Sequence, residues 1–201
     1  PVSFAAENAH TGAAGYLGWL EVESALRERL ATLINAPDTR GIGLVKNTSE
    51  GLSLVAQGLP WEAGDNIVGI AHEFPSNRVV WEALAPRGVA FRPVDVLGAT
   101  DPEAALLAAT DRHTRLLAIS SVHYARGLRL DLARLAEHCQ RTGILLCIDA
   151  IQSLGALHFD LADCPADFII ADGHKWLLGP EGLGLFYCAP AAMERLSLQQ
   201  F

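Results

Sequence analysis

Three groups of polar residues interrupt the apolar segments of this sequence, and each could take part in chemistry. Lys175 follows the apolar run "FIIAD" after only a glycine and a histidine, inside the glycine-rich segment "GHKWLLGPEGLG". Asp149 ends the run "ILLCI", and Thr48 and Ser49 come shortly after "GIGLVK". A lysine held against apolar walls loses proton affinity and becomes a usable amine nucleophile. A buried carboxylate needs a cationic or hydrogen-bond-donating partner.

Each of these residues also has an ordinary structural interpretation. Lys175 can be a surface lysine whose stem packs beside Trp176, and Asp149 can cap the segment that follows it. Thr48 and Ser49 can simply start a helix, a position that favours the same side chains. Taken one at a time, the structural interpretation is the better one for Lys175 and for Asp149.

Together the three groups are more specific than any one of them. Hydroxyls and free N–H groups at a helix start can hold a phosphate. A buried acid after a second strand can keep a ring nitrogen protonated, and an amine after a third strand can form a Schiff base with an aldehyde. Pyridoxal phosphate carries all three functional groups. Gln152 and His174 lie near these residues, although an exposed glutamine and a histidine packed in its turn are their structural alternatives.

The elements that must position these residues alternate along the chain. Apolar runs predict strands over 41–46, 66–71, 89–96, 115–122, 144–150, 168–172 and 182–188. Helical spacing predicts a first helix over 16–34 with a buried face formed by Leu26, Leu30, Leu33 and Ile34. A second helix is expected to begin at Thr48, and further helices are expected to have their N-caps at Ser76 or Asn77, at Asp101 and at Asp131. We expect Gly58 to cap the second helix at its C-terminal end.

This alternation predicts an α/β fold, a three-layer α/β/α sandwich with a mainly parallel sheet in which one late strand can be antiparallel. The strands are nearly uninterrupted apolar runs, as expected when both sheet faces are covered. Ligands of such sheets bind outside the carboxyl ends of the strands. Polar residues that follow strands are therefore expected at one edge, and they occupy 47–49, 72–77, 123–124, 149, 152, 172, 174 and 175.

Composition narrows the class of protein. The chain has 201 residues, half of them hydrophobic, and we expect one domain over 1–201. The net charge of −8 and the absence of a Lys/Arg cluster argue against a nucleic-acid partner. The apolar runs are too short to span a membrane, and no signal peptide opens the chain. Four cysteines without a CxxC spacing indicate reduced, buried thiols in a cytoplasmic protein and no metal site.

The motifs resemble a known family. The segment "IDAIQSLGALHFDLADCPADFIIADGHKWLLGPEGLGLFY" is similar to the core of class V (fold type I) pyridoxal-phosphate enzymes. That group includes cysteine desulfurases, selenocysteine lyases, isopenicillin N epimerase-like proteins and kynureninase. The segments "NTSEGLSLVAQGL" and "HEFPSN" match the family in the expected order. The chain begins without methionine and is similar to the large domain alone, so we expect it to be a piece of a longer protein.

The resemblance implies a role for each candidate residue. Lys175 would form the Schiff base with the cofactor, Asp149 would pair with its ring nitrogen, and Gln152 would contact its ring hydroxyl. The phosphate would be held by Thr48, Ser49 and His174.

Two positions depart from the usual family residues. Phe74 stands where the family often has a histidine stacked on the ring, and Tyr124 stands near a frequent asparagine. An aromatic ring still stacks, but the acid–base capacity of a histidine is absent.

The family's smaller C-terminal domain usually supplies the arginine that binds the substrate carboxylate. In desulfurases that domain also supplies the nucleophilic cysteine. The resemblance further implies a homodimer acting on a small amino acid.

Two other functions compete with this one. The chain could be a fold fragment or binding module without turnover of its own. A dinucleotide-binding oxidoreductase would also fit the alternating pattern, but no G-x-G-x-x-G follows the first strand, and "GPEGLG" comes late with the wrong order.

Overall fold

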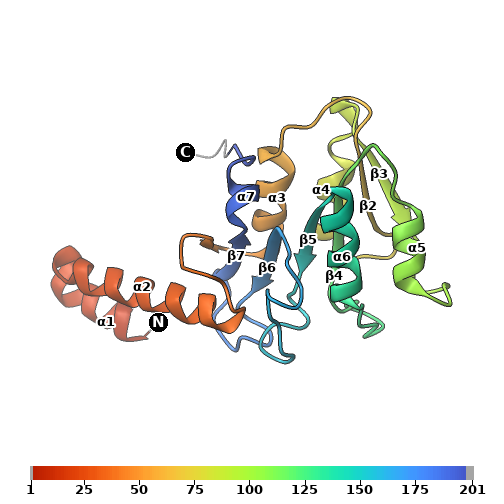
Figure 1. Cartoon of the computed structure of the whole chain (residues 1–201). Coiled ribbons are helices and arrows are strands. Elements are labelled where there is room, and N and C mark those ends of the chain that lie inside the picture. Colours follow the sequence, from red (N-terminus) through yellow and green to blue (C-terminus); the bar gives the residue numbers. More distant parts are fainter. Residues whose placement is uncertain (1, 198–201) are drawn as a thin grey trace.

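Seven strands form one sheet in the order β1-β7-β6-β5-β4-β2-β3 (Figure 1). The computed structural model describes residues 2–197. The strands are β1 (Ile42–Val45), β2 (Asn66–Ile70), β3 (Ala90–Val94), β4 (Thr114–Ser120), β5 (Leu145–Asp149), β6 (Phe168–Asp172) and β7 (Gly184–Cys188). β7 runs antiparallel to both of its neighbours, β1 and β6, and all the other strand pairs are parallel. The mainly parallel sheet with one late antiparallel strand is confirmed.

Helices cover both faces of the sheet. The helices are α1 (Val2–Thr11), η1 (Gly12–Gly15), α2 (Tyr16–Leu33), α3 (Thr48–Gly58), α4 (Ser76–Glu82), η2 (Ala85–Arg87), α5 (Pro102–Ala108), α6 (Leu132–Thr142) and α7 (Pro190–Met193). Side chains of α2, α5 and α6 join one hydrophobic core, and those of α3, α4 and α7 join another. The molecule is therefore the expected three-layer α/β/α sandwich.

Successive strand residues point into different cores, which explains the uninterrupted apolar runs. In β5, Leu146 and Ile148 belong to the core beneath α6, whereas Leu145 and Cys147 belong to the core beneath α3. All four side chains are buried. A strand covered on both faces has no position that favours a polar residue, so its polar residues fall at its ends.

Most helix boundaries follow local signals. The Asp101 side chain accepts a hydrogen bond from the N–H of Ala104, and Asp131 does the same for Arg134, as expected of N-caps. Gly143 ends α6 in the left-handed conformation, with a φ of 72°.

Three sequence predictions about the helices are wrong. The N-cap of α4 is Pro75, because Asn77 turns inward and its amide donates to Ser120 Oγ at 3.4 Å. Gly58 is the last residue of α3 rather than its cap, and a Cβ there would lie 2.7 Å from Leu196 Cδ1. Close packing, not a left-handed turn, therefore requires this glycine. Leu33, expected on the buried face of α2, is 39% exposed.

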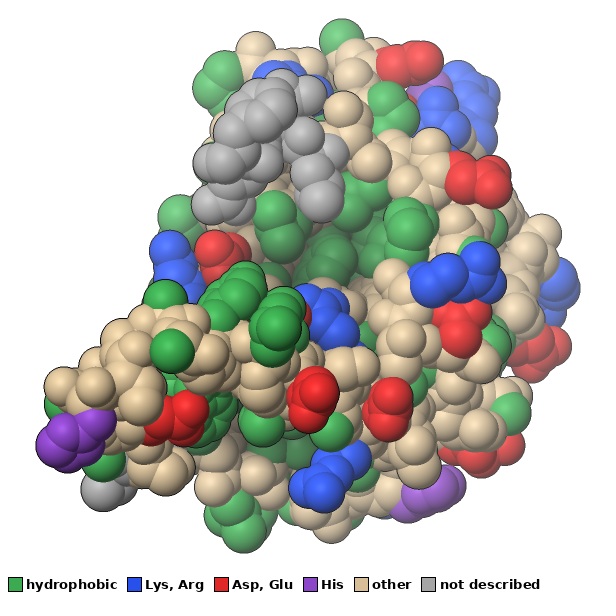
Figure 2. All heavy atoms as spheres, turned by 90° about the vertical axis from the view of Figure 1, so that its left-hand side faces the viewer, with side chains coloured by type: hydrophobic (Ala, Val, Ile, Leu, Met, Phe, Trp, Pro, Cys, Tyr) green, Lys and Arg blue, Asp and Glu red, His purple; other side chains and the backbone are tan. Residues whose placement is uncertain are grey.

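Helices α1 and α2 form an arm that extends away from the sheet (Figure 1). Viewed from the side of the arm, hydrophobic side chains appear on its surface (Figure 2). The exposed large apolar residues of the arm are Phe4, Tyr16, Leu17, Leu20, Val22 and Leu33. Over residues 2–197, no helix has the length and apolar character needed to cross a membrane.

Candidate functional site

The carboxyl ends of the parallel strands meet at one edge of the sheet, where a cavity of about 210 Å³ opens. The cavity is lined by Thr48, Ser49, Phe74, Ser76, Ser120, Tyr124, Asp149, Ile151, Gln152, Asp172, His174 and Lys175. All eight residues singled out from the sequence are among them, although their individual roles stay predictions. Two larger hollows, of about 510 and 550 Å³, lie elsewhere and contain none of the eight.

Lys175 lies in a tight turn that begins where β6 ends. The N–H of Gly173 donates to the Leu183 carbonyl at 2.9 Å, and the N–H of Gly179 donates back to the Gly173 carbonyl at 2.7 Å. A Cβ on residue 173 would lie 2.6 Å from the Leu183 oxygen, so the glycine is required for this close approach. The Lys175 side chain is half-buried, and within residues 2–197 its ammonium makes no hydrogen bond or ion pair.

Asp149 is the last residue of β5 and is only 3% exposed. Its Oδ1 accepts a hydrogen bond from the N–H of Ile151 at 3.1 Å, so it caps a turn and not a helix. Burial raises the pKa of Asp149 to about 7, and the nearby charge of Glu73 acts in the same direction. The charge of Lys175 opposes this rise in pKa. A cation placed against Asp149 would therefore favour its carboxylate form.

The start of α3 supplies a corner of hydrogen-bond donors. Thr48 and Ser49 are its first two residues, and the Asn47 side chain caps the helix by accepting from the N–H of Glu50 at 2.9 Å. The first N–H groups of a helix have no partner within the helix. Thr48 Oγ1 is buried and is without a hydrogen-bond partner in the described part of the chain. This corner therefore has unused donors for an anionic group.

Two aromatic rings stand at the mouth of the cavity. Phe74 and Tyr124 meet edge to face with ring centroids 5.5 Å apart, and both side chains are about half exposed. The His123 ring stacks on Tyr124 at 5.1 Å, and its Nε2–H donates to the His72 carbonyl at 2.8 Å. The residues after β2 and β4 are thus connected around the aromatic pair.

Four lining residues are not among the eight. Ser76 and Asp172 belong to the polar stretches noted after strands, whereas Ser120 and Ile151 were not predicted to lie at the site. Ser120 ends β4 and interrupts an apolar run, which was the available signal. Asp172, already noted as a polar residue after a strand, lies with its Oδ2 3.8 Å from His174 Nδ1.

The cysteines do not contribute to this site. All four are free and buried, and none of them lines the cavity. Burial raises the pKa of Cys139, Cys164 and Cys188 to about 12. These thiols are therefore protonated at neutral pH, and the predicted burial of the cysteines is confirmed for all four positions.

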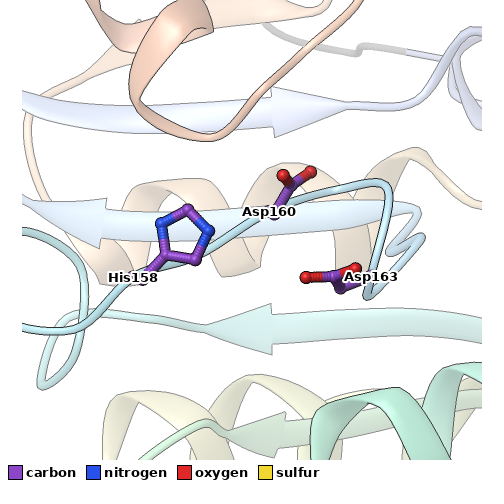
Figure 3. Close-up of side chains that lie close together, drawn as sticks. All are labelled: His158, Asp160 and Asp163. Atoms are coloured by element: carbon purple, nitrogen blue, oxygen red, sulfur yellow. The ribbon is translucent and has the colours of Figure 1, made fainter.

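A second polar group lies in the loop between β5 and β6 (Figure 3). The side chains of His158, Asp160 and Asp163 place a nitrogen and two carboxylates within 4.8 Å of one another. Asp160 accepts hydrogen bonds from the Asn35 amide at 2.8 Å and from the N–H of Ala162 at 2.7 Å. The bond from Asn35 fastens the loop to the segment that follows α2. His158, Asp160 and Asp163 line a hollow separate from that of Lys175.

The fold and this site define a class of protein, an α/β protein with an amine, a buried acid and an anion corner at one sheet edge. The family model for class V aminotransferases matches residues 18–200. The chain therefore belongs to the class V aminotransferase family, as the sequence motifs predicted.

The similar proteins have more than one activity. The chain is 37% identical to a probable cysteine desulfurase of Methanothermobacter thermautotrophicus over 187 residues, which cover 90% of this chain and 46% of that protein. It is 36% identical to isopenicillin N epimerase of Streptomyces clavuligerus, and the match covers 87% of this chain and 45% of that protein. A solved structure of a C-DES mutant with glycine linked to its PLP cofactor has a TM-score of 0.89. Its identity is 26%, and the match covers 98% of this chain and 53% of that one. The chain thus spans about half the length of the curated relatives that it matches.

Proposed function

We propose that this chain, residues 1–201, is the cofactor-binding large domain of a pyridoxal 5′-phosphate-dependent transferase or lyase acting on a small amino acid. Lys175 would be the residue that forms the Schiff base. The observation that carries the proposal is the single cavity shared by the Lys175 amine, the buried Asp149 and the Thr48 corner. The names of the relatives, a desulfurase and an epimerase, support amino-acid chemistry. The cofactor named for the C-DES structure supports pyridoxal phosphate.

The residues at the cavity fit this cofactor. The unpartnered Thr48 hydroxyl and the first N–H groups of α3 suit a phosphate, and Ser49 and His174 line the same cavity. The Asp149 carboxyl has one hydrogen bond from the protein and can still accept a bond from a ring N–H. Among residues 2–197 the Lys175 amine has no hydrogen-bond or ion-pair partner, so it is available to an aldehyde.

When bound, pyridoxal phosphate supplies an aldehyde that condenses with amines and a ring that accepts electrons from an adjacent carbanion. Asp149, as a carboxylate, would keep the ring nitrogen protonated. Gln152 would hydrogen-bond the ring hydroxyl, and Phe74 and Tyr124 would contact the ring. Once the substrate amine has displaced it, the Lys175 amine would be the base closest to the proton on the substrate α-carbon.

Borohydride trapping tests the proposal directly. The chain contains only two lysines, Lys175 and Lys46, and Lys46 is an exposed residue 3.8 Å from Glu50. After incubation with pyridoxal phosphate and reduction, we expect one pyridoxyl group per chain, located on the Lys175 peptide by mass spectrometry. The matched variants Lys175→Ala and Lys46→Ala should respectively lose and retain this label. Equal labelling of both lysines, or label on Lys46 alone, would contradict the proposal.

A binding module without turnover is the second candidate, and it is favoured by the share of the relatives that the chain spans. The two candidates differ in one measurement. Cofactor-loaded protein that consumes none of a panel of small amino acids, although Lys175 is labelled, would support the binding module. Homodimeric assembly rests on the family resemblance, and a cytoplasmic location rests on the cysteine pattern. Both stay predictions.

A further inference from the structure

Glu73 is a buried carboxylate that does not line the cavity but contacts two residues that do. It follows β2 and is 6% exposed. Its Oε1 accepts from the N–H of Ser120 at 3.0 Å. Its Oε2 accepts from the Ser120 hydroxyl at 2.8 Å and from the N–H of Phe74 at 3.1 Å. One carboxylate thus binds three donors from two cavity-lining residues.

These bonds join the ends of two strands. Phe74 belongs to the loop after β2, and Ser120 ends β4, which is the parallel neighbour of β2. Asn77 extends the contact, because its amide donates to Ser120 Oγ and its oxygen accepts from Trp81 Nε1 at 3.1 Å. Trp81 is fully buried. A continuous set of hydrogen bonds therefore runs from the core under α4 to the aromatic mouth of the cavity.

The charge of Glu73 also reaches the cavity. Burial raises the pKa of Glu73, while its bonds from Ser120 and Phe74 lower it and so favour the carboxylate. Its charge acts on Asp149 in the direction of a higher pKa. A charge buried in this way is costly unless its acceptors are occupied, and the three donors occupy them.

We propose that Glu73 is a positioning residue of the cofactor site, which holds Phe74 and Ser120 in place and thereby fixes the orientation of the bound ring. This inference rests on the proposed function. Glu73 is not among the residues that line the cavity, so its effect passes through the two residues that it binds.

The variant Glu73→Gln tests the inference, because it keeps the size of the side chain but replaces one acceptor oxygen with a donor. We expect pyridoxal phosphate to bind about tenfold more weakly, since one or two charge-assisted hydrogen bonds are lost. The circular dichroism of the bound cofactor, measured per mole bound in the visible range, should fall at least by half. Borohydride should still label Lys175. Unchanged affinity and dichroism in Glu73→Gln would overturn the inference.

Two further variants separate positioning from folding. Asp65 is a carboxylate at the opposite end of β2, 5% exposed, and its Oδ1 accepts from Arg115 at 2.8 Å. Asp65→Asn should lower the melting temperature and leave cofactor dichroism unchanged. If Asp65→Asn reduces the dichroism as much as Glu73→Gln does, Glu73 is only structural and the inference fails.

The variant Ser120→Ala removes one of the three donors and serves if Glu73→Gln does not fold. Its dichroism should fall by a smaller factor, and wild-type dichroism in this variant would again overturn the inference. If the unaltered protein binds no pyridoxal phosphate, the proposed function itself fails. The inference about Glu73 alone fails if the unaltered protein binds the cofactor and Glu73→Gln binds it with the same affinity and dichroism.

Discussion

The two edges of the sheet use the same kinds of polar residue in opposite ways. At the amino edge the polar groups pair with one another. The Asn66 amide donates to Asp111 at 2.9 Å, and the Thr114 hydroxyl donates to the Asn66 oxygen at 2.7 Å. Asp65 pairs with Arg115 at 2.8 Å. The polar side chains of this edge have partners within the protein, and their role is structural.

At the carboxyl edge the same residue types retain unused capacity. Among the described residues, the Thr48 hydroxyl has no hydrogen-bond partner and the Lys175 ammonium makes no ion pair. The Asp149 carboxyl accepts one hydrogen bond, from a backbone N–H. Native proteins satisfy nearly all buried polar groups, so a cluster of incompletely satisfied groups indicates a site for a ligand. The difference between the edges thus distinguishes a structural network from a binding site more clearly than residue type does.

The largest difference between the two edges is expected in the pH dependence of the unfolding free energy of the cofactor-free protein. Burial raises the pKa of Asp149 to about 7, so between about pH 4 and pH 7 the folded protein holds a proton that the unfolded chain releases. The free energy of unfolding should therefore fall as pH rises through this range, by up to about 4 kcal/mol. Asp149→Asn should remove most of this fall in urea unfolding measured at a series of pH values.

Asp111 at the amino edge should behave in the opposite way. Hydrogen bonds from Asn66 and then Arg92 hold the pKa of Asp111 below its ordinary range. The stability it contributes is present above about pH 4 and is lost as pH falls toward the folded-state pKa. Asp111→Asn should reduce the loss of stability at acid pH and leave the pH dependence attributed to Asp149 unchanged. The same slope in both variants would refute the proposed difference between the edges.

A matched pair of threonine substitutions is the next largest test. Thr114→Val removes a hydroxyl that donates to Asn66 and, more weakly, to the Asp111 carboxylate, and that accepts from the N–H of Asp111 at 2.9 Å. This change should cost about 1–3 kcal/mol. Thr48→Val removes a hydroxyl without a partner in the described chain, and should leave stability unchanged or raise it by about 1 kcal/mol. Thr48→Val should nevertheless weaken cofactor binding. Chemical denaturation decides the comparison, and equal losses in both variants would contradict it.

The smallest effect on stability and cofactor binding is expected for a substitution of Lys46, which does not line the cavity. Lys46 is an exposed lysine at the carboxyl edge, 3.8 Å from Glu50. An exposed ion pair contributes little, so Lys46→Ala should change the unfolding free energy by less than about 0.5 kcal/mol. Its cofactor affinity should match that of the unaltered protein. A large loss of affinity would show that the functional region extends beyond the cavity.

Local signals in the sequence predicted most helices and strands, and they predicted that the site lies at one edge of the sheet. Asp101 and Asp131 cap the helices they were expected to cap, because an N-cap depends only on the next few residues. Asn77 was expected at a helix start but is buried and bonded to Ser120, which local spacing does not encode. Glu73 lay within the polar stretch after its strand, where an acid is ordinarily exposed, so its inward orientation was not predicted.

The sequence by itself determined the strands, the helices between them and the polar residues at the strand ends, since apolar periodicity and capping act over short distances. Only the tertiary structure decided the strand order, in which β1 lies beside β7 and two strands away from β6. That order brings the start of α3 to the turn of Lys175, and Gly51 of α3 packs so closely on Ile170 of β6 that a Cβ would lie 2.7 Å away. Such neighbours follow from burying both faces of the sheet. The protonation of Asp149 and the role of Glu73 depend on these neighbours, because burial and nearby charge set the pKa of an acid.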